Sequence, residues 1–265
     1  MKIDFHIHTN CSDGVYSPAE VIDRAAREGY NMLAITDHDS AAAHAALKDY
    51  PLPENLRIIK GVEITSNYQD REIHILGYFR DGFAPELESF LKGAQEERNR
   101  RMNTSIKNLE QFKISVTYKE LFKYSKGESV GRNHLASLLV DKGYVASQKE
   151  AFNLYLNDDT AIVPPMMTSV KRAIELIHGS NGIAAWAHPA YENFQAFVPV
   201  FVGYGLDAIE VYNQKRSLAN ARHYRNTAEG LGLMATAGSD WHGFEGESFL
   251  TNYLPEVVER FVNIF

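Results

Sequence analysis

Short apolar segments that end in a metal-binding type of side chain recur along this chain. Three of them lie near the N-terminus: Lys2 to Phe5 before His6 and His8, Met32 to Thr36 before His38, and Ile58 to Val62 before Glu63. Near-continuous apolar strands that alternate with helices indicate a parallel sheet. We therefore predict an α/β protein whose polar side chains gather at one end of the strands, where barrel enzymes keep their active sites.

Strands and helices alternate in both terminal parts of the sequence. A first helix is predicted to begin after Ser17, which with Pro18 and Glu20 forms a capping box with proline at the first helical position, and to end before Gly29. Strands are expected at residues 2–5, 32–36, 57–63, 72–78, 182–186, 208–212 and 233–237.

The alternation stops between residues 85 and 165, where apolar residues return at helical spacing. Shorter helices are predicted there at 133–141 and 147–156. We expect a barrel domain formed by residues 1–84 and 166–265, with a helical subdomain inserted at 85–165. A chain of 265 residues, 45% of them apolar, can bury the core of such a barrel.

Charge and cysteine content limit the possible partners. Because 34 Asp and Glu residues outnumber 27 Lys and Arg, the formal net charge of −7 argues against binding long nucleic acid through a basic surface. A small phosphorylated substrate is compatible with it, because several divalent ions would make a local pocket positive. The single cysteine, Cys11, excludes a disulfide framework. With no leader and no membrane-length apolar stretch, a soluble cytoplasmic protein without membrane contact is expected.

Nine side chains of metal-binding type follow one another along the chain: His6, His8, Asp13, His38, Glu63, His74, His188, Asp240 and His242. Strand alternation turns His6 and His8 to the same side, so one ion can bind both. Glu63 is the natural bridging ligand, because its two oxygens can bind separate ions about 3.5–4 Å apart. We expect Asp240 to join the first ion, His74 and His188 to complete the second, and Asp13, His38 and His242 to hold a third.

These residues lie in short motifs: His6-Ile7-His8-Thr9-Asn10-Cys11-Ser12-Asp13-Gly14, Thr36-Asp37-His38, Gly61-Val62-Glu63, Ala187-His188-Pro189 and Gly238-Ser239-Asp240-Trp241-His242. As an ordered set they resemble the motifs of the polymerase and histidinol phosphatase (PHP) family, and most closely its stand-alone nucleotide phosphatases and short-RNA exonucleases. The resemblance spans essentially the whole chain. It implies a distorted (β/α)7 TIM-like barrel, two or three Mn, Fe or Zn ions, and all nine residues as metal ligands.

The resemblance also implies an Arg-x-His element of the insertion that covers the site, matched here by Arg132-Asn133-His134. Arg132 would grip a phosphate through a bidentate fork, and His134 would donate to one of its oxygens. The alternative for both is a plain helix start, because Gly131 and Asn133 favour turns and caps.

Other charged residues are interpreted as structural. The run from Glu96 to Arg101 is read as an exposed helix face rather than a phosphate clamp. Three further histidines are also interpreted as structural, because they lie in helical or charge-rich stretches: His44, His178 and His223.

Together these features predict metal-dependent hydrolysis of a phosphate monoester by a hydroxide that bridges two ions. Glu63 and Asp240 would act through the ions, and Arg132 and His134 on the phosphate. The preferred substrate is a small nucleotide, such as a nucleoside 3′,5′-bisphosphate or an AMP-like compound. The alternatives are a 5′-to-3′ exonuclease on short RNA, a sugar-phosphate or histidinol-phosphate phosphatase and, as a different class, a non-catalytic regulatory module stabilised by metal.

Overall fold

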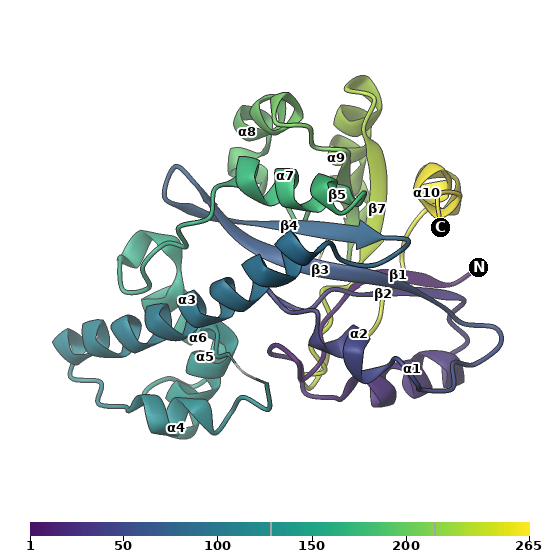
Figure 1. Ribbon diagram of the computed structural model, residues 1–265. Helices are drawn as coiled ribbons and strands as arrows, with labels where there is room; N and C mark the ends of the chain where they lie inside the picture. The colour runs from purple at the N-terminus through teal and green to yellow at the C-terminus, as the bar shows by residue number, and fades with distance from the viewer. Residues whose placement is uncertain (128, 215) are drawn as a thin grey trace.

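The computed structural model describes residues 1–127, 129–214 and 216–265, and its strands form one sheet in sequence order. The strands are β1 (Ile3–Ile7), β2 (Met32–Ile35), β3 (Arg57–Tyr68), β4 (Arg71–Phe79), β5 (Ile183–Trp186), β6 (Ala208–Asn213) and β7 (Met234–Gly238). The first and last strands meet, because the N–H of His8 donates to the carbonyl of Trp241 and the N–H of Asp240 to that of His6, both at 2.9 Å. The expected α/β barrel is confirmed and is nearly closed (Figure 1).

The direction of β4 departs from the predicted parallel sheet. β1 to β3 are mutually parallel, as are β5 to β7, whereas β4 is antiparallel to both β3 and β5. Only Gln69 and Asp70 join β3 to β4, and both have positive φ angles (51° and 59°), as in a two-residue hairpin turn. Such a turn leaves no room for the crossover helix that parallel neighbours need. The prediction of a parallel sheet is therefore wrong for β4 and correct for the other strand pairs.

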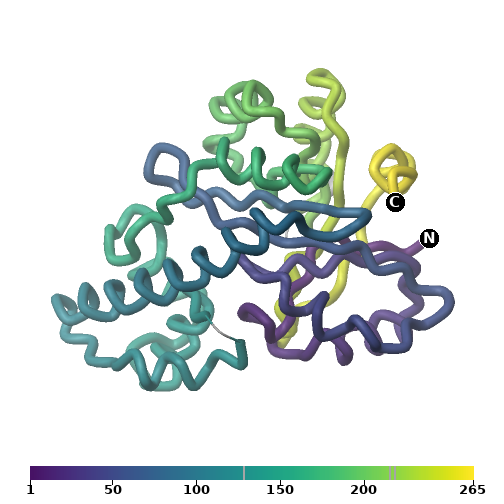
Figure 2. Tube along the Cα trace, in the orientation of Figure 1, coloured from purple at the N-terminus to yellow at the C-terminus, as the bar shows by residue number. Residues whose placement is uncertain are grey.

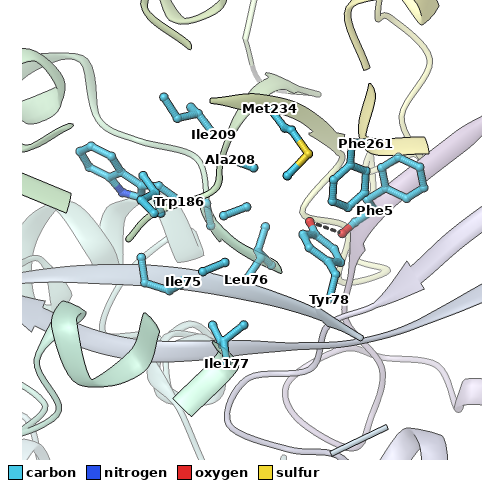
Figure 3. Close-up of a cluster of buried hydrophobic side chains, with 14 of the residues drawn as sticks. Phe5, Ile75, Leu76, Tyr78, Ile177, Trp186, Ala208, Ile209, Met234 and Phe261 are labelled. Atoms are coloured by element: carbon cyan, nitrogen blue, oxygen red, sulfur yellow. Dashed lines mark hydrogen bonds between the residues drawn. The ribbon is translucent and has the colours of Figure 1, made fainter. Parts of the chain in front are cut away.

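Helices pack around the barrel: α1 (Pro18–Arg27), α2 (Ala42–Ala46), α7 (Val170–Gly179), α8 (Tyr191–Gly203), α9 (Leu218–Gly230) and α10 (Pro255–Val262). The predicted capping box of Ser17 and Glu20 is present at the start of α1. The barrel core includes Phe5 and Tyr78, whose hydroxyl donates to the Phe5 carbonyl at 3.0 Å (Figure 3). Phe261 of α10 packs against both rings, so this helix covers one part of the barrel core.

Helices between Pro85 and Leu156 extend to one side of the barrel in Figure 2: α3 (Pro85–Leu109), α4 (Tyr118–Phe122), α5 (Arg132–Asp141), α6 (Gln148–Ala151) and a π-helical turn (Phe152–Leu156). They enclose a second apolar cluster that includes Met102 and Leu109 of α3. The beginning of the same helix belongs to the barrel, because Leu87 and Leu91 pack in the barrel core. None of the described helices is both long enough and apolar enough to cross a lipid bilayer.

Candidate metal centre

The nine predicted ligand residues come together at one end of the barrel, at or just after the strands that carry them. Six of them line a cavity of about 370 Å³: Asp13, His38, His74, His188, Asp240 and His242. The other three, His6, His8 and Glu63, are fully buried beside these six. His188 (φ 28°) and Asp240 (φ 59°) have left-handed backbone conformations, which are costly for residues other than glycine and cluster at functional sites.

Glu63 lies at the middle of this group. The sequence predicted Glu63 at the end of a strand. It lies instead within β3, because β3 continues to Tyr68 and so extends past the end of the neighbouring strand β2. Its Oε1 lies 3.1–3.3 Å from ring nitrogens of three histidines: His6, His74 and His188. Its Oε2 lies 3.2 Å from His8 Nε2 and 3.0 Å from His38 Nδ1. The two oxygens thus face different imidazoles, which is the arrangement that a bridging carboxylate needs.

Four overlapping groups of side chains offer ligand atoms that lie within 4.8 Å of one another: His8 with Asp13, His38 and His242; His6 with His8 and Asp240; His6 with Glu63 and His188; and His38 with Glu63 and His74. The grouping differs in part from the expected one, because His188 joins His6 while His74 joins His38. Glu63 belongs to two of the groups, so it still connects them.

The unsatisfied polar atoms of the centre test whether cations fit there. Nine buried side-chain nitrogen or oxygen atoms of the described residues lack a hydrogen-bond partner, and five belong to predicted ligands: His8, Asp13, His38, Glu63 and His242. Buried polar atoms are otherwise almost always paired. Imidazole nitrogens and carboxylate oxygens suit Zn, Mn and Fe alike. The residues present therefore fit a polynuclear site for divalent transition ions.

Electrostatics couple these groups to protons. Burial would raise the pKa of Glu63, but the surrounding histidines, His38 and His6 foremost, hold that pKa well below its usual range. Burial lowers the pKa of His74 and of His8, yet the neighbouring carboxylates outweigh it and raise the two pKa values to about 9 and about 10. Cations must displace these protons, so ion binding is linked to proton release.

Two buried carboxylates that the sequence alone did not indicate contact predicted metal ligands. Glu210 of β6 lies 2.9 Å from His6 Nδ1 through Oε1, and its Oε2 accepts the N–H of His188 at 2.7 Å. Glu72 of β4 lies 2.8 Å from His74 Nε2. Both could have been suspected: Glu210 is an acidic residue inside an apolar strand, and Glu72 precedes His74 by two residues and so faces the same side.

The loop that carries Asp13 is also held in place. Asp37 accepts hydrogen bonds from the N–H and hydroxyl of Thr9 and from the hydroxyl of Ser12. The amide of Asn133 donates to Asp13 Oδ2 at 2.8 Å, so the start of α5 contacts a predicted ligand directly.

The interpretation of the run from Glu96 to Arg101 as an exposed face was wrong for two of its arginines. Arg98 and Arg101 are each only 7% exposed and line the cavity. Arg98 pairs with Asp39 at 3.0 Å, and Arg101 pairs with Glu72. Both lie in the buried stripe of α3, which runs from Leu91 through Ala94 and Arg98 to Arg101 in steps of three or four residues. The remaining histidines, His44, His178 and His223, lie outside the four ligand groups.

Of the two predicted phosphate-binding residues, Arg132 lines the cavity and His134 does not. The guanidinium of Arg132 pairs with Glu72 and Asp158. His134 is buried, and its Nδ1 accepts the N–H of Gly131 at 3.1 Å, which caps the start of α5. Burial lowers the pKa of His134, so the ring is neutral. Its expected role as a donor to the phosphate stays a prediction.

The profile of the PHP domain matches residues 4–162, a span that contains the first six predicted ligands. The chain belongs to the PHP family. Two relatives with named activities are similar over most of the chain. The 5′-3′ exoribonuclease Rnm of Escherichia coli (strain K12) is 34% identical over 247 residues, which cover 90% of this chain and 84% of Rnm. The 3′,5′-nucleoside bisphosphate phosphatase of Chromobacterium violaceum is 32% identical over 254 residues, with coverages of 91% and 87%.

Solved structures agree with this PHP assignment. A Chromobacterium violaceum protein described as an amidohydrolase with bound sulfate aligns over all of this chain and 96% of its own, with a TM-score of 0.87 and 30% identity. A Bifidobacterium adolescentis protein described as a candidate metal-dependent phosphoesterase has the same coverages, a TM-score of 0.82 and 25% identity. The chain is a metal-dependent phosphoesterase with the expected TIM-like barrel.

Proposed function

We propose that the protein is a phosphatase that removes a phosphate monoester from small nucleotides, such as a nucleoside 3′,5′-bisphosphate or an AMP-like compound. One observation carries this proposal: a single cavity of about 370 Å³ is lined both by predicted metal ligands and by Arg98, Arg101 and Arg132. Cations and arginines together neutralise the charge that a phosphate develops during hydrolysis. The cavity is also within the size range of small-molecule sites.

The nine residues His6, His8, Asp13, His38, Glu63, His74, His188, Asp240 and His242 would hold two or three Mn, Fe or Zn ions. When bound, such ions supply Lewis acidity and activate water at neutral pH. The chain itself supplies orientation. Arg132 binds the phosphate through its fork, and Glu63 spans the ligand groups. Because His134 Nδ1 accepts from Gly131, the proton of its neutral ring lies on Nε2. We propose that this N–H would be the donor to the leaving oxygen.

A 5′-to-3′ exonuclease on short RNA is the second candidate, because Rnm is similar over most of the chain. It needs space for nucleotides beyond the first. An adjoining cavity of about 410 Å³ shares Glu72, His74 and His188 with the site, and its other charged lining residues are Arg71, Asp158, Asp159 and Glu192. This excess of acidic groups disfavours a further phosphodiester there. We therefore prefer the phosphatase, and we keep a cytoplasmic location without long nucleic-acid or membrane partners as a prediction.

The deciding experiment measures phosphate release from a nucleoside 3′,5′-bisphosphate, a nucleoside monophosphate and a sugar phosphate, and mononucleotide release from a 5′-phosphorylated pentanucleotide. We expect the highest kcat/KM with one of the two nucleotides. A higher kcat/KM for mononucleotide release from the pentanucleotide would establish the exonuclease instead, and a preference for the sugar phosphate would remove the nucleotide from the proposal. The non-catalytic alternative is not retained, because the chain belongs to a family of metal-dependent hydrolases.

A further inference from the structure

Glu72 contacts groups from three parts of the chain, and the proposed reaction assigns it no step. Its carboxylate is 7% exposed. Oε1 lies 2.8 Å from His74 Nε2 and also accepts from the guanidinium of Arg132, while Oε2 accepts from Arg101. His74 is a predicted metal ligand and Arg132 is the proposed phosphate-binding residue. One carboxylate therefore contacts both halves of the site.

The contact between Glu72 and His74 determines which ring nitrogen of His74 carries the proton and which one can bind an ion. His74 Nδ1 lies 3.1 Å from Glu63 Oε1 and 3.3 Å from His188 Nε2. A carboxylate next to Nε2 keeps the ring proton on that nitrogen, which leaves the lone pair of Nδ1 for an ion. Glu72 thus selects the form of His74 that can bind metal.

The contact with Arg132 is part of a set that fixes the guanidinium in one orientation. Its Nη1 donates to the carbonyl of Leu156 at 3.2 Å and to Asp158 Oδ1 at 3.1 Å. Its guanidinium carbon lies 5.7 Å from the ring centroid of Phe152. Leu156 and Phe152 both belong to the π-helical turn, an irregularity that is frequent at functional sites. Arg132 is therefore oriented at the cavity before any phosphate arrives.

We infer that Glu72 is a positioning residue that couples the metal half of the site to its phosphate half; this inference rests on the proposed function. A glutamine in its place would remove the negative charge that both halves share. With its N–H₂ in the place of Oε1, both His74 Nε2 and Arg132 lose their acceptor, and the His74 proton moves to Nδ1. With its N–H₂ in the place of Oε2, Arg101 loses its acceptor, and the neutral amide oxygen that remains is a weaker acceptor than a carboxylate for His74 and Arg132. Both orientations therefore weaken the two halves together.

Glu72→Gln is compared with Arg132→Gln and Asp158→Asn, which change the phosphate half and leave the Glu72 carboxylate beside His74 Nε2. Zinc affinity is measured by competition with a chelator, and phosphate affinity as the inhibition constant of inorganic phosphate. Glu72→Gln should lose about 10–100-fold in zinc affinity and about tenfold in phosphate affinity. The other two variants should lose phosphate affinity and keep wild-type zinc affinity. Unchanged zinc affinity in Glu72→Gln, or a zinc loss without a phosphate loss, would overturn the inference.

Two further measurements keep the test decisive if Glu72→Gln folds poorly. The double variant Glu72→Gln/Arg101→Met removes the buried arginine charge that the single variant leaves unpaired, and it should lose zinc affinity where Arg101→Met alone does not. Nitrogen-15 NMR of the zinc-loaded wild-type protein should show the His74 proton on Nε2, and a proton on Nδ1 would contradict the inference. Failure of the proposed function is distinguishable, because the wild-type protein itself would then not release phosphate preferentially from the nucleoside bisphosphate or monophosphate.

Discussion

The Nδ1 of His6 lies 2.9 Å from Oε1 of Glu210, although the two residues are 204 positions apart in the sequence. Both are buried, and the other oxygen of Glu210 accepts the N–H of His188. Glu210→Gln should lower zinc affinity about 10–100-fold, because the amide no longer fixes the proton on His6 Nδ1. Chelator competition measures this. Glu229→Gln, on the exposed surface of α9, is the control, and equal affinities in the two variants would contradict the prediction.

Glu63 should be indispensable, because each of its oxygens faces a different set of histidines. We expect Glu63→Gln to reduce phosphate release to the level of a buffer blank and to retain fewer ions per chain, as measured by elemental analysis after dialysis. Glu54→Gln, at an exposed loop position, should change neither. Wild-type activity in Glu63→Gln would exclude a bridging role.

Arg132→Ala should weaken substrate binding without removing the ions. Loss of a charge-assisted contact of about 1.5–3 kcal/mol predicts a KM that rises roughly 10–100-fold for phosphorylated substrates. Steady-state kinetics and metal content are measured on the same preparation. Arg100→Ala is the matched control, because Arg100 is largely exposed and pairs only weakly, with Glu96 at 3.7 Å. An unchanged KM in Arg132→Ala would remove this residue from the phosphate site.

The metal-free protein should become less stable as the pH rises from about 7 to 9.5. His74 and His8 have pKa values raised to about 9 and about 10, above the value near 6.5 expected in the unfolded chain. Their stabilising contribution is therefore complete below about pH 6.5 and is lost as the pH rises through the folded-state pKa values. Zinc affinity should rise over the same range, since the ion binds neutral imidazole.

Thermal unfolding of chelator-treated and zinc-loaded protein across this pH range tests both the expected loss of stability and the expected rise in zinc affinity. The zinc-loaded protein is the internal control, because bound ions replace the protons on the histidines. A metal-free protein that gains stability between pH 7 and 9.5 would contradict the raised pKa values.

Gly238 is a position where any side chain should harm both fold and site. A Cβ there would lie 2.2 Å from the Cβ of His6 and 2.7 Å from Oε1 of Glu210. We expect Gly238→Ala to lower the free energy of unfolding by about 1–3 kcal/mol and to reduce zinc affinity as His6 is displaced. Gly230→Ala in α9 is the control, because its Cβ would meet no atom within 4 Å. Denaturant unfolding of both variants provides the comparison.

The barrel and the convergence of the nine ligand-type residues could be predicted because the strand pattern is local and the polar residues follow it. The direction of β4 could not be predicted, because Gln69 and Asp70 adopt positive φ angles and the turn contains no glycine, the residue that usually indicates such a turn in a sequence. The hairpin also explains why β3 extends past Glu63: β4 pairs with β3 along the whole length of β4.

The buried arginines of α3 escaped prediction for a different reason. Arg98 and Arg101 are tolerated inside because Asp39 and Glu72 neutralise them, and those partners come from segments distant in the sequence. Charge runs are usually solvated, so the run from Glu96 to Arg101 was interpreted from its composition and not from its spacing. The stripe that contains Leu87, Leu91 and Ala94 continues through both arginines.

The reversed direction of β4 also determines how the insertion reaches the site. Because β4 runs away from the predicted metal ligands, α3 begins at the far end of the barrel and must return along its outside (Figure 1). Its 25 residues span about 37 Å, enough to anchor in the barrel core, pass the cavity and enter the second apolar cluster. The direction in which Arg98 and Arg101 point therefore depends on the rotation of one continuous helix about its own axis. One added residue between Leu91 and Arg98 would turn the two arginines by about 100° about the helix axis, so we expect this segment to tolerate substitution far better than a change of length.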